Sequence, residues 1–237
     1  MSPFRPRVDT APLFALLPHP LAAGLAPHLE RLPDPGEAIA LLARLRERDA
    51  LPGDPVRLHA LLTIGGCSPW LAALLEQDPE TIEVLPSLGP APVAATRDDL
   101  EQSLARFEFR RSGLDLPALL RRFKEREYLR IATADFLRLA DLSLTVRSLS
   151  RLADILVDRA LRSARALLEA RHGEPAARND RGEIERSGFV VLALGKLGGE
   201  ELNYSSDIDL LYLFDRAGAA GRGRSRTGRT SRAWPRR

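Results

Sequence analysis

Two short apolar runs joined by a glycine-rich turn constrain the fold of this chain most strongly. The runs cover residues 189–194 and 208–214, and the turn between them contains Gly195, Gly198 and Gly199. Continuous apolar runs of this length are typical of strands that are buried on both faces. Glycine can take positive φ and lets the backbone approach a ligand closely, and successive amides in such a turn can bind an anion. We therefore expect a strand, a phosphate-binding turn and a second strand.

Two aspartates at the start of the second run are the candidate catalytic and metal-binding residues. Asp207 and Asp209 are two positions apart, so on a strand both side chains point to one face while Ile208 points into the core. Neighbouring carboxylates repel each other unless a cation lies between or in front of them. Mg²⁺ prefers carboxylate oxygens together with substrate phosphates. The pair facing a glycine turn therefore indicates in-line phosphoryl or nucleotidyl transfer assisted by one or two metal ions.

The spacing of the turn differs from the two common phosphate-binding loops. Lys196 is not followed by Ser or Thr after a G-x-x-x-x-G spacing, which excludes a Walker A loop, and no G-x-G-x-x-G is present at this point. The sixteen residues 195–210 instead resemble the signature of the glutamine synthetase adenylyltransferase and adenylyl-removing enzymes. Those enzymes belong to the DNA polymerase beta-like nucleotidyltransferase superfamily. One of their two similar halves attaches AMP to a tyrosine of glutamine synthetase, and the other removes it by phosphorolysis and releases ADP.

The resemblance implies roles for individual residues and for ligands. Asp207 and Asp209 would bind Mg²⁺, and the nucleotide-binding residues would be those of the turn and of the segment that shapes it: Gly195, Lys196, Gly198, Gly199, Ser205 and Ser206. ATP or ADP and phosphate would be substrates. Glutamine synthetase and a nitrogen-signalling regulatory protein would be partners.

The resemblance also favours one of the two halves. The motif begins about 195 residues from the start, behind a helical region, where the family carries its adenylyl-removing half (adenylyl-L-tyrosine phosphorylase). The arginine-rich segment 121–132 looks like the helix before the core of that half, although a solvated helix face is an alternative. Two other functions remain open: a nucleotidyltransferase with another acceptor, and a non-catalytic helical interaction module.

Composition and start signals predict a mostly α-helical region before the motif. Hydrophobic residues make up 44% of the chain and aromatic residues only 5%, and Leu and Ala dominate, which favours helices. Residues 20–31 and 36–49 read as short helices, and N-cap residues start further ones at Asp54, Ser68, Thr96 and Asp115. We expect the helix that starts at Asp54 to end at Gly65-Gly66. Apolar residues recur at helical spacing over 149–168, which predicts a buried stripe that ends at His172-Gly173.

The expected organisation has five parts. They are a loosely ordered N-terminus (1–18), a helical region (19–171), a surface loop (172–187), the start of an α+β polymerase-beta-like nucleotidyltransferase core (188–215) and a disordered basic tail (216–237). The tail lacks an apolar period and resembles out-of-frame translation, with a functional basic tail as the rival interpretation. It also lacks the third carboxylate that the family carries beyond this point. The sheet would then be incomplete, with an exposed apolar face, and we expect the chain alone to be nearly inactive and prone to aggregate.

Charge and cysteine content exclude several classes of protein. The net charge of +3 arises in the tail, whose eight arginines leave 27 basic and 32 acidic residues in the rest of the chain. Nucleic-acid binding is therefore not expected. The single cysteine, Cys67, cannot form an intrachain disulfide and has no activating neighbour in sequence. No signal peptide or membrane-spanning run is present, so we expect a cytoplasmic protein without membrane partners.

Overall fold

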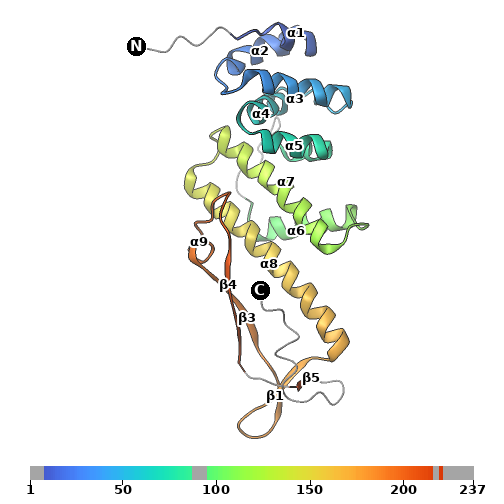
Figure 1. Cartoon of the computed structure of the whole chain (residues 1–237), viewed down its shortest axis with the longest axis vertical. Helices are drawn as coiled ribbons and strands as arrows, with labels where there is room; N and C mark the ends of the chain where they lie inside the picture. The colour runs from blue at the N-terminus through green and yellow to red at the C-terminus, as the bar shows by residue number, and fades with distance from the viewer. Residues whose placement is uncertain (1–7, 87–94, 216–218, 221–237) are drawn as a thin grey trace. The chain divides into compact units, whose positions relative to one another are not determined.

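The chain divides into two compact units, which are described here separately. A computed structural model describes residues 8–86, 95–215 and 219–220. The first unit is Met1–Ser148 and the second is Leu149–Arg237 (Figure 1). The predicted basic tail (216–237) lies almost wholly outside the described residues. Among the helices of the described part, none is both long and apolar enough to cross a membrane.

The first unit is entirely helical over its described residues. In chain order its helices are α1 (Ala11–Leu16), α2 (His19–Leu29), α3 (Pro35–Glu47), α4 (Pro55–Cys67), α5 (Pro69–Gln77), the 3-10 helix η1 (Pro79–Val84), α6 (Arg97–Arg110) and α7 (Leu116–Phe136). Helix α1 lies in the segment that the sequence predicted to be loosely ordered, and its Leu13 is fully buried. A buried apolar contact therefore orders residues that are rich in proline.

The predicted helix starts are confirmed at all four N-caps. Asp54 accepts a hydrogen bond from Val56 N at 2.9 Å, and Ser68 accepts one from Leu71 N at 3.3 Å. Thr96 and Asp99 form a reciprocal capping box, and Asp115 caps α7. Each cap satisfies a backbone amide that has no partner inside its own helix.

Helix α4 continues through Gly65 and Gly66 to Cys67, so the expectation that these glycines end it is wrong. A Cβ atom on Gly65 would lie 2.9 Å from Cα of Ala38 in α3, and one on Gly66 would lie 2.9 Å from the Leu32 side chain. Gly65 lets α3 and α4 approach closely, and Gly66 leaves room for the segment that precedes α3. Packing against a neighbour therefore outweighs the low helix propensity of glycine.

The second unit contains most of the long helix α8 (Leu142–His172), followed by short strands. Helix α8 ends as predicted at His172, and Gly173 has a φ of +81°. The predicted apolar stripe is buried only at its start: Leu149 and Leu152 are each 1% exposed, whereas Leu167 is 71% exposed. Periodicity establishes which residues share a face, but it does not establish how much of that face is covered.

The strands form two small antiparallel sheets. Strands β1 (Pro175–Arg178), β2 (Ile184–Arg186) and β5 (Ala219–Ala220) pair in the order β2-β1-β5. The hairpin of β1 and β2 thus lies within residues 172–187, where the sequence predicted a surface loop. Asn179 forms the turn of this hairpin by accepting hydrogen bonds from Arg181 N and Glu183 N, both at 2.9 Å. Backbone pairing can order such a polar segment without an apolar core.

Strands β3 (Phe189–Leu194) and β4 (Asp209–Phe214) form the second sheet, in which they lie side by side as a two-stranded antiparallel pair (Figure 1). Neither strand is buried: half-buried and exposed residues alternate along β3, where Val190 is 47% accessible, and β4 is mostly exposed, with Leu213, the partner of Val190, 42% accessible. The expectation of strands buried on both faces is therefore wrong. The prediction of an incomplete sheet with an exposed apolar face is confirmed.

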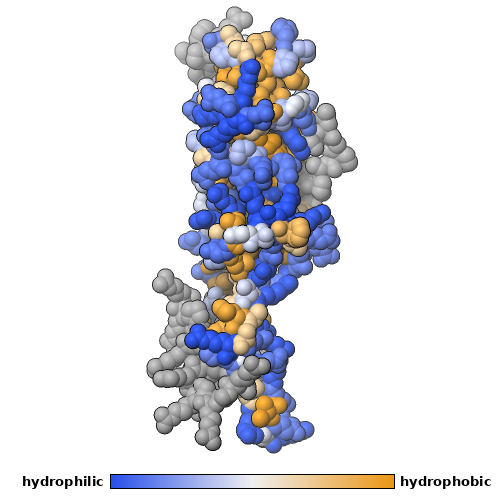
Figure 2. Space-filling view, turned by 90° about the vertical axis from the view of Figure 1, so that its right-hand side faces the viewer, coloured by the Kyte–Doolittle hydropathy of each residue, from blue (hydrophilic) through white to orange (hydrophobic). Residues whose placement is uncertain are grey.

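The observed architecture confirms the expected fold class, a mostly helical region followed by a small α+β region. On the face shown in Figure 2, hydrophilic side chains cover most of the surface and apolar ones form smaller patches between them. At the end of the β3–β4 pair that lies away from the glycine turn, Asp215 accepts hydrogen bonds from Ser187 Oγ at 2.6 Å and Gly188 N at 2.9 Å. These bonds fix the end of β4 to the start of β3.

Candidate functional site

The candidate site lies where β3 ends and β4 begins. The antiparallel register pairs Leu194 with Asp209, so the second aspartate of the motif stands beside the first glycine of the turn. A Cβ atom on Gly195 would lie 3.7 Å from Oδ2 of Asp209. Gly195 has a φ of +55°, as predicted for a residue that reverses the chain. Strand pairing therefore brings a carboxylate and the glycine turn together.

Neither Gly198 nor Gly199 takes positive φ, and only Gly198 is required for space. Both lie at the end of α9 (Gly195–Gly198), and the residue after them that takes positive φ is Glu200, at +56°. A Cβ atom on Gly198 would lie 2.5 Å from the carbonyl oxygen of Ala193, closer than real Cβ atoms approach. The turn can fold back against β3 only because this position lacks a side chain.

The segment after the turn is anchored to the helix of its own unit. Leu202 N donates a hydrogen bond to Ser150 Oγ of α8 at 3.1 Å. Leu197 and Leu202 are 4% and 3% exposed, so they are the apolar residues that hold the turn in place. Glu201 N donates to the carbonyl oxygen of Lys196 at 2.7 Å, which closes the turn. Ser150 carries no sequence signal that points to this role.

Asn203 organises the two serines of the motif and was not among the predicted site residues. Its Oδ1 accepts hydrogen bonds from Ser206 Oγ at 2.6 Å and from Ser205 N at 3.2 Å. Ser206 Oγ lies 3.4 Å from Nζ of Lys196, so the predicted residues on the two sides of the loop meet here. The sequence signal was available, because Asn often accepts from the backbone two residues later.

Asp207 does not lie on the strand, contrary to expectation. Strand β4 starts at Asp209, and Asp207 precedes it in an exposed segment. Ile208 is 39% exposed and does not enter a core. The geometric argument that places both aspartates on one strand face is therefore wrong for this chain. Both carboxylates are exposed and remain close in sequence.

The donor atoms at this site suit a hard cation. Among the described residues, no group of three or more His, Cys, Asp or Glu side chains gathers to hold a metal ion. Mg²⁺ commonly binds through only one or two carboxylates and takes its other ligands from substrate phosphates and water. Asp207 and Asp209 match that requirement in kind. Cys67 gives no alternative centre, because burial raises the pKa of its thiol and disfavours the reactive thiolate.

A comparison with protein families agrees with the residues at this site. The family model for glutamate-ammonia ligase adenylyltransferase matches residues 58–233. The match begins in α4, includes every residue of the candidate site, and continues past Phe214 into the basic segment.

Proposed function

Because the chain belongs to the glutamate-ammonia ligase adenylyltransferase family, we propose that it acts in the removal of AMP from a tyrosine of glutamine synthetase by phosphorolysis. The family acts on glutamine synthetase. The choice of the adenylyl-removing half rests on the position of the motif behind a long helical region, of which α7 and α8 are the last two helices.

The observation that supports nucleotidyl chemistry most directly is that the carboxylate of Asp209 lies close to Gly195. A turn whose backbone approaches phosphate closely needs a charge-neutralising partner nearby, since a nucleotide brings several negative charges. The carboxylate of Asp209 stands 3.7 Å from the position of a Cβ on Gly195, which puts a potential metal ligand at the turn.

Mg²⁺ would be held by Asp209 and Asp207 and would neutralise charge on the phosphoryl groups. Lys196 would add a positive charge on the other side of the turn, where Ser206 and Asn203 restrict its position. Asn203 would hold Ser205 and Ser206 beside the same ligand, because its Oδ1 accepts from Ser205 N and Ser206 Oγ.

We expect the 237-residue chain to bind nucleotide but to catalyse the removal of AMP only slowly. The described sheet has two strands, and the described residues provide two carboxylates at the site and no third. A pair of exposed carboxylates positions a metal ion less well than a set held by a covered sheet.

Nucleotide binding tests the proposal first. Titration calorimetry with ADP should show binding that requires Mg²⁺ and that weakens about tenfold or more in Asp209→Asn. Asp180→Asn is the matched control, because Asp180 is an exposed aspartate of the same unit, in the turn between β1 and β2. Binding that is indifferent to Mg²⁺ and to Asp209→Asn would refute a metal-dependent nucleotide site and favour a non-catalytic helical module.

The direction of the reaction needs a second assay. Adenylylated glutamine synthetase with labelled AMP should release label as ADP when phosphate and Mg²⁺ are present. Transfer of label from ATP to glutamine synthetase, without phosphorolysis, would assign the chain to the transferase half. Transfer to a different acceptor would support the alternative nucleotidyltransferase.

A further inference from the structure

A hollow of about 270 Å³ lies in the first unit, on helices that take no part in the candidate nucleotide site. Residues of η1, α6 and α7 line it, and Arg111 follows α6 directly. The lining is dominated by charged side chains: Glu80, Glu83, Arg110, Arg111 and Arg126. Three arginines therefore line one concave surface: two from the end of α6 and the residue after it, and one from α7.

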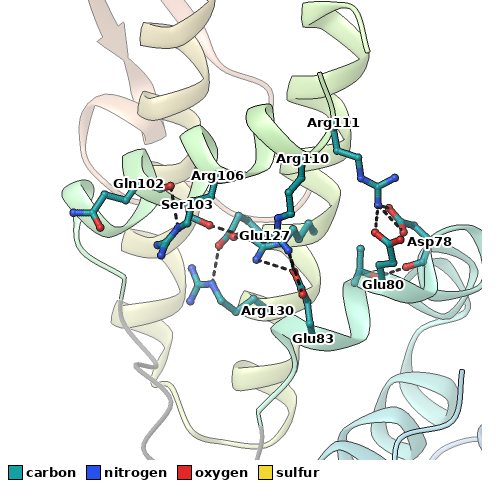
Figure 3. Close-up of polar contacts among 12 residues, drawn as sticks. Asp78, Glu80, Glu83, Gln102, Ser103, Arg106, Arg110, Arg111, Glu127 and Arg130 are labelled. Atoms are coloured by element: carbon teal, nitrogen blue, oxygen red, sulfur yellow. Dashed lines mark hydrogen bonds and ion pairs between the residues drawn. The ribbon is translucent and has the colours of Figure 1, made fainter. Parts of the chain in front are cut away.

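The arginines of the hollow are held by carboxylates of η1 and of the residue before it. Arg111 Nη2 donates to Asp78 Oδ2 at 2.9 Å and to Glu80 Oε2 at 2.8 Å. Arg110 Nη1 lies 3.2 Å from Glu83 Oε1. Figure 3 shows these side chains pointing toward one another across the space between the helices. The guanidinium groups are thus preorganised at the hollow.

Arg126 is the most deeply placed of the three. Its side chain is only 13% exposed, and its Nη1 donates to Ser103 Oγ at 3.1 Å and to Glu127 Oε1 at 2.6 Å. Its Nε is buried and has no hydrogen-bond partner within the described part of the chain. Burial lowers the pKa of Arg126, whereas the carboxylates of Glu127 and Glu83 raise it. A buried donor without a partner is costly, so this group favours a further acceptor.

Glu83 occupies the position between two of these arginines only loosely. Its Oε1 is 3.2 Å from Arg110 Nη1 but 3.8 Å from Arg126 Nη2, and its side chain is 47% exposed. Exposed ion pairs of this kind contribute little free energy, so Glu83 can leave at small cost. A dianion at the same place would interact more strongly than a single carboxylate does.

We propose that this hollow binds a small, multiply charged oxyanion of the phosphate class, and that Glu83 competes with it for Arg110 and Arg126. Guanidinium groups recognise phosphate oxygens through paired N–H donors, which suits three arginines around one anion. The volume is that of about nine water molecules at roughly 30 Å³ each, which accommodates phosphate or pyrophosphate. It lies below the range of about 300–1,000 Å³ that holds larger organic ligands.

Titration calorimetry with inorganic phosphate tests the proposal on the whole chain. The buffer contains no Mg²⁺, which suppresses binding at the candidate nucleotide site, and KCl keeps the ionic strength constant. We expect a dissociation constant of about 1 mM or lower. Arg110→Gln should weaken binding about tenfold, and Glu83→Gln should tighten it about threefold because the competitor loses its charge. Lys196→Gln is the control for phosphate at the glycine turn and should bind like the unchanged protein.

The opposite signs of the two variants separate a binding site from an ion-pair network that only stabilises the fold. Arg110 and Glu83 are both about half exposed, and circular dichroism checks that both variants keep their helices. The proposal is overturned if phosphate does not bind, if Arg110→Gln and Glu83→Gln change affinity in the same direction, or if Lys196→Gln abolishes binding.

Discussion

The ion-pair cluster at Glu127 provides the sharpest test of how the first unit is stabilised. Glu127 is 2% exposed, and its two carboxylate oxygens accept from Arg126 Nη1 at 2.6 Å and Arg130 Nε at 2.7 Å. Both arginines are themselves largely buried, at 13% and 18% exposure. Replacing Glu127 by Ala would leave two buried guanidinium groups without this shared partner.

Removing one member of a buried ion pair costs about 3–5 kcal/mol, because the remaining charge stays desolvated. Arg126 keeps a distant partner in Glu83 at 3.8 Å, which reduces the penalty. We therefore expect Glu127→Ala to lower the free energy of unfolding of the first unit by about 3 kcal/mol. Glu127→Gln keeps an acceptor for one arginine and should cost less.

Urea denaturation followed by circular dichroism measures this change. Glu101→Ala is the matched control, since Glu101 pairs with Arg97 on the surface of α6, where the two side chains are 39% and 51% exposed. Exposed pairs four residues apart contribute about 0.3–0.5 kcal/mol, so the control should stay within that range. A loss below about 1 kcal/mol for Glu127→Ala would refute the reasoning, because it would mean that water reaches the arginines.

Three further predictions concern the glycine turn, His28 and the exposed β3–β4 pair. Gly198→Ala should weaken Mg²⁺-dependent ADP binding in titration calorimetry, because the new Cβ would lie 2.5 Å from a backbone oxygen. Gly199→Ala is the control and should bind ADP nearly normally, because the nearest atom to its Cβ would be 3.6 Å away. Burial, together with His59 and Arg31, lowers the pKa of His28 to about 4 in the folded state, so only the unfolded state gains this proton as the pH falls below about 6.5. Stability should therefore decline between pH 6.5 and 4, and a urea midpoint with the same pH dependence in His28→Asn would contradict this assignment. Leu192 and Leu211 lie at paired positions of β3 and β4 and are each 42% exposed. Replacing both by Lys should reduce aggregation in light scattering without loss of helix. Unchanged aggregation would show that another surface is responsible.

The sequence alone identified features that depend on near neighbours. The caps at Asp54 and Thr96 act on amides two or three residues away, so their outcome is determined within one turn of the chain. The contiguous motif over 195–210 likewise indicated the family that the comparison then matched. The positive φ of Gly195 and the end of α8 before Gly173 are also determined by the local sequence.

Tertiary structure decided what lies against what. The sequence could not show that Gly198 is required by a carbonyl oxygen of β3, or that Asn203 holds Ser206, since both depend on how the loop folds back. It predicted strands buried on both faces from their apolar runs, whereas β3 and β4 are largely exposed. An apolar run records which residues favour burial, but burial requires a partner surface, and that surface is a property of the whole fold.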